Sequence, residues 1–237
     1  MTYAHSFYKD KFSEKNRIKT QTILNAEDRV ETKYNQLKDV MMTYVYTEER
    51  VVSHIKRLKN ECAAGCDGIQ SEHLKYCINS AIPSHLSNVF TLCAKFGLVP
   101  KTVTMGILVP ILKKTNIDPT VAKNYRPIIV STVFSKIIEM NILEESNTGC
   151  FNNMQFGFVE GRGTNMAIRL ASDVTEYCNK RGSSVYACAL DAEMAFDGIP
   201  HSILLHKAVG VIPDVWWRIL HKWYSELHIK VKWNGKL

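Results

Sequence analysis

The stretch that decides the fold is VTMGILVPILKKTNIDPTVAKNYRPIIV, residues 103–130. Both ends are rich in branched apolar residues and the centre is polar, and strand, short polar loop, strand is the pattern of a β-hairpin. The spacing predicts antiparallel pairing of residues 103–112 with residues 127–130. Pro110 cannot donate a hydrogen bond to a neighbouring strand, so it favours a sheet edge or a bulge.

Helical patterns flank this hairpin on both sides. Thr47 has the features of a helix N-cap, and the apolar residues that follow it recur on one helical face. Gly97 has the features of a helix end. The tail LHIKVKW alternates between apolar and polar residues, as a half-exposed strand does. The mixed order predicts an α+β fold, with helices expected at residues 47–60, 83–96, 131–145, 164–181, 201–209 and 213–226.

The run VYACAL, residues 185–190, indicates a buried strand that delivers Asp191 at its carboxyl end. Glu193 and Asp197 follow closely, and carboxylates in such a place can hold Mg²⁺. The alternative is that Asp191 caps the following turn and that Asp197 is a solvated acid at a helix start. From this segment alone the turn cap is the favoured interpretation.

Cationic residues surround the polar loop of the hairpin: Lys113, Lys114, Lys123 and Arg126. Flexible lysines and a forked guanidinium suit a triphosphate or a nucleic-acid backbone, although a solvated loop has the same composition. Aromatic residues that interleave with Arg126 and Arg162 would suit base or sugar stacking, with core packing as the alternative: Tyr125, Phe156 and Phe158.

Composition narrows the class of protein. The 237 residues carry 30 Lys and Arg against 23 Asp and Glu, a formal charge of +7, which fits a polyanionic partner. A hydrophobic content of 46% excludes wholesale disorder. Seven scattered cysteines indicate reduced thiols, and no signal sequence or apolar span is present, so we expect an intracellular protein of the cytoplasm or nucleus.

A zinc site is a weaker alternative for part of these cysteines. Cys62, Cys66, His73 and Cys77 have suitable ligand types. Their spacing departs from the short C-x2-C knuckle, and His73 and Cys77 are better explained as positions on one helix.

Six short blocks carry a resemblance to a known family. AAGCDGI, ILVPILKK, NYRPIIV, SKIIE, QFGF and LDAEMAFD follow one another over residues 47–237. In this order they resemble the reverse transcriptase domain of non-LTR, LINE-like retrotransposons. The resemblance implies a right-hand polymerase fold, with the hairpin at the fingertips and the strand before Asp191 in the palm. It also implies RNA-directed DNA polymerase activity with an RNA template, a DNA primer, dNTPs and Mg²⁺.

The resemblance also implies roles for individual residues. Asp191 would be the first metal-binding aspartate, and the carbonyl of Ala192 would be a secondary metal ligand. Arg126 and one of Lys113 or Lys114 would contact the incoming triphosphate.

Further implied roles concern the sugar and the template. Phe196 would lie under the sugar and exclude a 2′-hydroxyl, the group that separates ribo- from deoxynucleotides. The loop of residues 155–162 resembles the segment that approaches template and nucleotide, and its template-proximal residues would be Gln155, Phe156, Gly157 and Arg162.

The family pattern also contains a Gly-x-x-Gln-Gly block and a Tyr/Phe-Ala-Asp-Asp hairpin. Neither occurs here, so we expect fingers and the first part of the palm only, an incomplete domain that is inactive alone. Residues 1–46 would be a loosely packed or helical lead-in, and residues 47–237 the truncated reverse transcriptase-like part. The alternatives are a non-catalytic nucleic-acid-binding remnant and a related intron-encoded maturase. The sequence does not set the oligomeric state.

Overall fold

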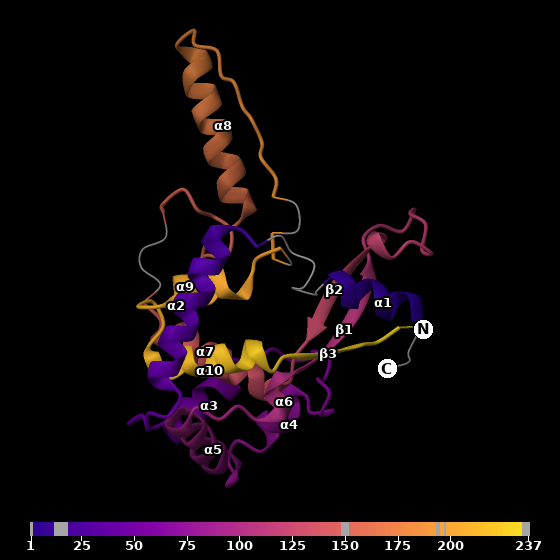
Figure 1. Cartoon of the computed structure of the whole chain (residues 1–237). Coiled ribbons are helices and arrows are strands. Elements are labelled where there is room, and N and C mark those ends of the chain that lie inside the picture. Colours follow the sequence, from indigo (N-terminus) through magenta and orange to yellow (C-terminus); the bar gives the residue numbers. More distant parts are fainter. Residues whose placement is uncertain (1, 12–18, 148–151, 193–194, 197, 234–237) are drawn as a thin grey trace. The chain divides into compact units, whose positions relative to one another are not determined.

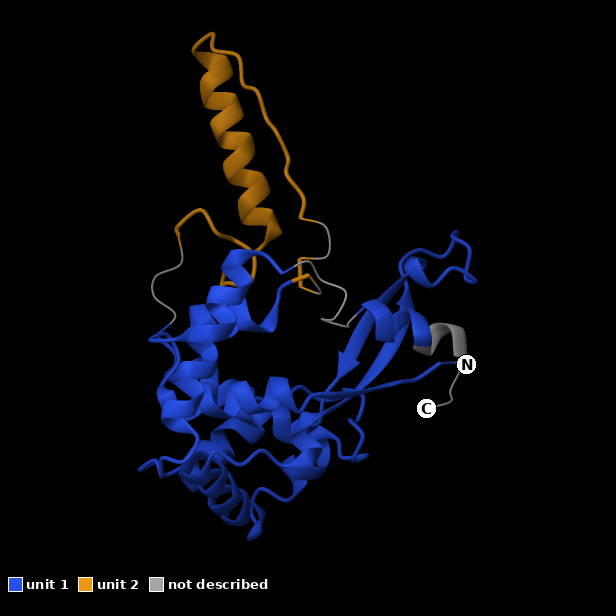
Figure 2. Ribbon diagram, in the orientation of Figure 1, with its two compact units in different colours: residues 1–147, 199–237 blue, residues 148–198 orange. Residues whose placement is uncertain are grey.

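The computed structural model describes residues 2–11, 19–147, 152–192, 195–196 and 198–233 (Figure 1). The fold is mixed α and β with a small sheet, as the sequence predicts. The chain forms two compact units, residues 1–147 with 199–237 and residues 148–198 (Figure 2). The helices are α1 (Thr2–Lys11), α2 (Gln21–Leu37), α3 (Glu48–Arg57), α4 (Ser71–Tyr76), α5 (Ile82–Phe96), α6 (Lys101–Thr104), the 3₁₀ turn η2 (Ala122–Asn124), α7 (Val133–Glu145), α8 (Thr164–Lys180), α9 (His201–Ala208) and α10 (Asp214–Ser225).

The sheet of unit 1 has the strand order β2-β1-β3. Strand β1 (Met105–Leu112) pairs antiparallel with β2 (Tyr125–Val130), which confirms the predicted hairpin. Strand β3 (His228–Val231) forms from the alternating tail, as predicted, and pairs in parallel with β1. The parallel partner was not predicted, because nothing local in the tail identifies a strand so distant in the sequence.

Two prolines face each other within this sheet. Pro110 lies opposite Pro127. The amide of Lys113 donates to the carbonyl of Asn124 at 2.9 Å, and hydrogen-bonded pairs alternate along an antiparallel ladder. The proline pair therefore falls where no hydrogen bond is exchanged between the two strands. On its other side β1 pairs with β3 only as far as Leu108, so Pro110 occupies a local edge, in agreement with the prediction.

Helix α10 lies at the centre of unit 1. Its consecutive residues Trp216, Trp217 and Arg218 are 0%, 0% and 2% exposed. Because successive helical side chains point about 100° apart, this burial shows that other elements surround the helix. The indole of Trp216 donates to Glu145 of α7 at 2.6 Å, and that of Trp217 donates to the Leu205 carbonyl of α9 at 2.9 Å.

Arg218 joins α10 to two further helices. Its guanidinium donates to backbone carbonyls at or just beyond the C-terminal ends of α2 and α5: Leu37 and Ala94 at 2.9 Å, Lys95 at 3.2 Å, and Val40. Helix C-termini leave carbonyls unpaired and carry partial negative charge, so a buried cation is well placed between two of them.

Gly97 allows this arrangement. It ends α5 in the left-handed conformation, with φ of +64°, as predicted for a helix end. A Cβ atom at this position would come within 2.5 Å of Arg218 Nε. Glycine therefore satisfies both the backbone conformation and the close approach of the arginine.

Part of the predicted lead-in before Thr47 is a helix with buried residues. Within α2, Ala26, Val30 and Leu37 are buried, and Tyr46 is fully buried. Helix α2 contacts α9 and α10. The helical alternative for the lead-in therefore describes Gln21–Leu37. The apolar face of α2 consists of a few residues among many charges, which hides its period in the sequence.

A buried histidine links α3 to α7. Thr47 is the N-cap of α3, as predicted, and accepts a hydrogen bond from the Arg50 amide. His54, with no exposed surface, contacts the hydroxyl of Tyr46 through Nδ1 and lies 2.8 Å from Glu144 through Nε2. Burial tends to raise the pKa of Glu144, but hydrogen bonds from His54 and Arg57 outweigh it and leave this pKa below its usual value.

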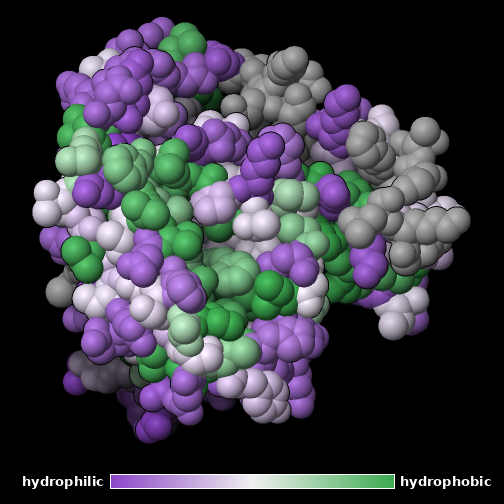
Figure 3. All heavy atoms as spheres, turned by 90° about the horizontal axis from the view of Figure 1, so that it is seen from below, coloured by the Kyte–Doolittle hydropathy of each residue, from purple (hydrophilic) through white to green (hydrophobic). Residues whose placement is uncertain are grey.

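Helix α5 also exposes an apolar stripe. Val89, Leu92 and Phe96 are 44%, 50% and 48% exposed, whereas Phe90 and Cys93 beside this stripe are buried. Figure 3, seen from below relative to Figure 1, shows hydrophobic side chains interspersed with hydrophilic ones. Within the described part of the chain, no helix is long and apolar enough to cross a membrane.

Replacement of Arg218 by methionine should strongly destabilise the fold. The side chain keeps much of its volume, but four backbone carbonyls each lose a hydrogen bond from the guanidinium, and removal of one partner of a buried charged contact costs about 3–5 kcal/mol. Urea unfolding measures this loss. The control Arg169→Met changes an exposed guanidinium on α8 and should shift stability by about 0.5 kcal/mol or less. Equal effects of the two changes would contradict the role of Arg218.

Glu144→Gln should reduce the loss of unfolding free energy that the protein shows as the pH falls. A carboxyl whose pKa is lowered in the folded state adds stability above its ordinary value of 4.5, and this stability disappears as the pH falls through the lowered pKa. The variant should be less stable than the parent at neutral pH, and the difference should shrink in acid. Urea unfolding at several pH values measures it, with the exposed Glu176→Gln on α8 as control. A difference that does not vary with pH would refute the assignment.

Candidate functional site

The predicted cationic residues of the hairpin lie at the surface of unit 1. Lys113, Lys114 and Arg126 are exposed, and Arg126 lies opposite Ile111 in the β1–β2 register. The Lys113 ammonium donates to the Lys123 carbonyl at 2.8 Å. Among the described residues, none of these cations forms an ion pair with a carboxylate. Their charge is therefore available to an anionic ligand.

The loop between β1 and β2 is held by its own hydrogen bonds. The Asp118 carboxylate accepts from the Thr120 amide at 2.8 Å and from the Thr120 hydroxyl at 2.7 Å. These bonds, the hydroxyl first, lower the pKa of Asp118. The Asn124 side chain donates to the Asp118 carbonyl at 2.8 Å, and the Tyr125 hydroxyl donates to the Pro119 carbonyl at 3.0 Å. The loop that carries the lysines is thus ordered by internal contacts.

The segment before Asp191 differs from the prediction. Residues 183–192 have no strand assignment, and Tyr186 and Leu190 are 94% and 95% exposed. The expected buried strand is wrong for this structure. A strand requires a hydrogen-bonded neighbour, and the strands of the described chain all lie in unit 1. In unit 2 the only described helix, α8, has no buried residue.

The metal-binding prediction rests on donor chemistry alone. The carboxylate of Asp191 and the carbonyl of Ala192 are oxygen donors of the kind that Mg²⁺ takes, and both residues are exposed. Glu193 and Asp197 lie outside the described residues. Within the described ranges, no three His, Cys, Asp or Glu side chains come together as a metal-binding group. Among the described residues, Asp191 and Ala192 therefore gain no further metal ligand.

Phe196 lies next to the glycine-rich loop of unit 2. Its ring packs edge-to-face on Phe158, with 5.6 Å between ring centroids, and both side chains are largely exposed, at 75% and 89%. Phe158 has a φ of +60°, an uncommon conformation for a bulky residue. The structure thus brings together Phe196 and the loop that the sequence assigned to the nucleotide and template.

Arg162 orders this loop. Its Nη1 donates to three carbonyls of residues 152–155: Asn152 at 3.0 Å, Asn153 at 3.2 Å and Gln155 at 2.9 Å. The Gln155 side chain in turn donates to the Gly157 carbonyl at 3.3 Å, and Phe156 is half-buried. At least one nitrogen of Arg162 is therefore engaged in holding the loop. The predicted site residues fall into two groups, one in each unit.

The pattern of four potential zinc ligands does not assemble. Cys62, Cys66, His73 and Cys77 are all described, and they do not form a metal-binding group. His73 Nδ1 instead accepts a hydrogen bond from the Gln70 amide at 3.1 Å, in the capping box of α4. The helical interpretation of these positions is the one that the structure supports.

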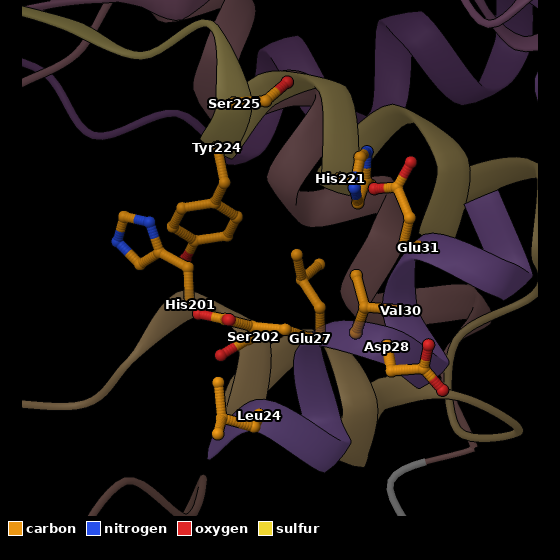
Figure 4. Close-up of a pocket in the computed structure, with 11 residues that line it drawn as sticks. Leu24, Glu27, Asp28, Val30, Glu31, His201, Ser202, His221, Tyr224 and Ser225 are labelled. Atoms are coloured by element: carbon orange, nitrogen blue, oxygen red, sulfur yellow. The ribbon is translucent and has the colours of Figure 1, made fainter. Parts of the chain in front are cut away.

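A pocket that the sequence did not indicate lies between α2, α9 and α10 (Figure 4). Its volume is about 800 Å³, and its charged lining is acidic: Glu27, Asp28 and Glu31. His221 stacks on Tyr34 with 4.1 Å between centroids, and burial lowers the pKa of this histidine. Three carboxylates disfavour phosphate groups, so we do not assign the nucleotide to this pocket. In the sequence, the only sign of this pocket is that the three carboxylates fall on one side of the helix α2.

Comparison with known proteins identifies the family of this chain. The family described as "Reverse transcriptase (RNA-dependent DNA polymerase)" matches residues 111–236. This range covers the hairpin from the end of β1, the glycine-rich loop, Asp191 and β3.

Curated relatives extend the similarity toward the N-terminus. The chain is 28% identical over 180 residues to the "Putative 115 kDa protein in type-1 retrotransposable element R1DM" of Drosophila melanogaster, a match of 72% of the chain and 16% of that protein. It is 25% identical over 198 residues to the "RNA-directed DNA polymerase from mobile element jockey" of Drosophila funebris, and 26% identical over 196 residues to the "Probable RNA-directed DNA polymerase from transposon BS" of Drosophila melanogaster. The two matches cover 80% and 78% of the chain, and each covers 21% of its relative.

Proposed function

Since the chain belongs to the reverse transcriptase family, in the group of non-LTR, LINE-like retrotransposons, we propose that it takes part in RNA-directed DNA synthesis. The reaction adds a deoxynucleotide from a dNTP to the 3′-hydroxyl of a DNA primer on an RNA template. The chain spans only about a fifth of the length of its curated relatives, so we assign it a share of this activity. The carrying observation is the exposed hairpin, whose cations form no ion pair within the described chain.

The hairpin would act as the fingertips of a right-hand polymerase fold. Arg126 would contact the triphosphate of the incoming nucleotide through its forked guanidinium, and Lys113 or Lys114 would contribute an ammonium group. Such cations stabilise the charge that spreads over a phosphoryl group during transfer. The ordered loop between the strands supports this role, because it limits the motion of the lysines.

The second group of residues would serve the metal, the sugar and the template. Asp191 and the Ala192 carbonyl would be ligands of Mg²⁺, which, when bound, neutralises charge on the phosphates. Phe196 would lie beneath the sugar and discriminate against the 2′-hydroxyl. The loop that Arg162 orders would contact the template through Gln155, Phe156 and Gly157. The Phe196–Phe158 contact supports this grouping.

The partners would be an RNA template, a DNA primer and dNTPs. We propose an intracellular location, in the cytoplasm or nucleus, where such templates occur. The described cysteines are all free, which supports a reducing compartment.

A non-catalytic nucleic-acid-binding role is the second candidate. It is favoured by one observation, the exposed segment before Asp191 that belongs to no sheet. In that case the basic hairpin would retain affinity for polyanions without supporting nucleotidyl transfer. Primer extension distinguishes the two candidates.

Arg126→Ala should weaken dNTP binding about tenfold or more and leave the fold intact. The guanidinium is exposed and has no ion-pair partner in the described chain, so its loss costs little stability. Titration with dTTP, followed by protein fluorescence, gives the affinity, and thermal unfolding tests the fold. The control Arg29→Ala removes an exposed arginine on α2 and should bind dTTP like the parent. Unchanged binding in the Arg126 variant would remove the residue from the nucleotide site.

Asp191→Asn should abolish primer extension with little effect on template binding, because it removes a metal ligand at nearly constant volume. The assay joins the sequence to the segment that follows the matching region in the jockey polymerase, and measures extension of oligo(dT) on poly(rA) with Mg²⁺. In the same chimera Phe196→Ala should instead let ribonucleotides compete. Full extension by the Asp191 variant would exclude a catalytic role for it and return it to the role of turn cap.

A further inference from the structure

The register of the three strands determines which side chains share a face of the sheet. Residues that lie opposite each other in neighbouring strands point to the same side. Arg126 lies opposite Ile111, and Lys230 and Val130 both lie opposite Ile107. We call this side the open face of the sheet; it consists of Met105, Ile107, Val109 and Ile111 of β1, Arg126, Ile128 and Val130 of β2, and His228 and Lys230 of β3.

Lys232 continues the open face just beyond β3. Its amide donates to the Leu108 carbonyl at 2.8 Å, so the backbone still follows β1 at this point. The next residue, Trp233, points to the other side, where its ring packs on Tyr125 with 5.0 Å between centroids. Lys230 and Lys232 therefore lie on the same side, two residues apart, or about 7 Å along the strand.

The other face of the sheet is more covered, although Ile129 on it is 43% exposed. Leu108 is fully buried there, and Tyr125 and Trp233 are half-buried. Tyr8 of α1 is 2% exposed, and burial, and then proximity to Tyr125, raises its pKa. On the open face His228, Lys230 and Lys232 are exposed, as are Arg126 and Ile128, whereas Ile107 is only 9% exposed.

The charge on the open face has one sign. Strands β1, β2 and β3 contain no aspartate or glutamate. Neither Lys230 nor Lys232 forms an ion pair with a carboxylate of the described chain. The two lysines border one side of an aliphatic centre, and Arg126 borders the other. An apolar floor between cationic borders suits a chain of bases linked by phosphates.

We propose that the open face binds the backbone of a single nucleic-acid strand, with Lys230 and Lys232 as phosphate contacts. The inference rests on the proposed function and deepens it, because it adds β3 to the surface that meets the template. Lysines supply such contacts as mobile point charges, which hold a strand without reading its sequence. The exposed aliphatic side chains would contact unpaired bases, which a duplex does not offer.

Binding of labelled oligo(rU), followed by fluorescence anisotropy over a range of salt concentrations, tests the proposal on the whole chain. Lys230→Gln/Lys232→Gln should weaken binding several-fold at low salt. The slope of log affinity against log salt should become shallower by about 0.7 for each lysine lost. The control Lys56→Gln/Lys59→Gln removes the same charge from two exposed lysines at the end of α3 and should keep the parental affinity and slope.

The outcomes separate this inference from the proposed function. If the double variant and its control bind equally while Arg126→Ala weakens binding, the role of β3 is refuted and the proposed function stands. If the parent chain does not bind oligo(rU) even at low salt, both fail. A glutamate-rich peptide that binds as tightly as oligo(rU), with the same loss in the double variant, would reassign the face to an acidic partner. Thermal unfolding of each variant excludes loss of fold as the cause.

Discussion

The buried guanidinium of Arg218 is the contact on which unit 1 depends. A charge removed from water is costly unless hydrogen bonds replace its solvation, so the carbonyls that receive Arg218 fix the ends of α2 and α5 against α10. Trp216 and Trp217 extend the same helix to α7 and α9. Helix α10 ends at Ser225 and β3 begins at His228 (Figure 1), so the position of this helix also sets where β3 meets β1.

Features encoded by neighbouring residues could be predicted from the sequence. The hairpin follows from two branched apolar runs around a polar loop. The start of α3 follows from the hydroxyl of Thr47, and the end of α5 from the conformational freedom of Gly97. In each case the interaction that forms the feature is local, so its signal lies within a few residues. The exposed cations of the hairpin were found for the same reason.

Features that depend on distant partners could not be predicted. The alternating tail indicates a strand, but its parallel pairing with β1 joins segments more than a hundred residues apart, and only that pairing unites Lys230 with Arg126 on one face. The sequence of α10 shows helical period but not burial on every side. The run of residues 185–190 has the composition of a strand, but composition does not show whether a partner strand is present to form hydrogen bonds with it. Because that strand does not form, Asp191 does not lie at the edge of a sheet as predicted.

The distribution of charge connects the fold to the proposed function. The carboxylates of α2 gather at the pocket beside α9 and α10, whereas the sheet carries cations and no acid. A chain with a formal charge of +7 attracts polyanions in general, but attraction is strongest where cations are not neutralised locally. In the β1–β2 loop the one carboxylate, Asp118, binds Thr120 and not a lysine. The hydrogen bonds of Asp118 therefore order the loop of the hairpin, and Lys113 and Lys114 are not neutralised by this carboxylate and can bind an anionic ligand.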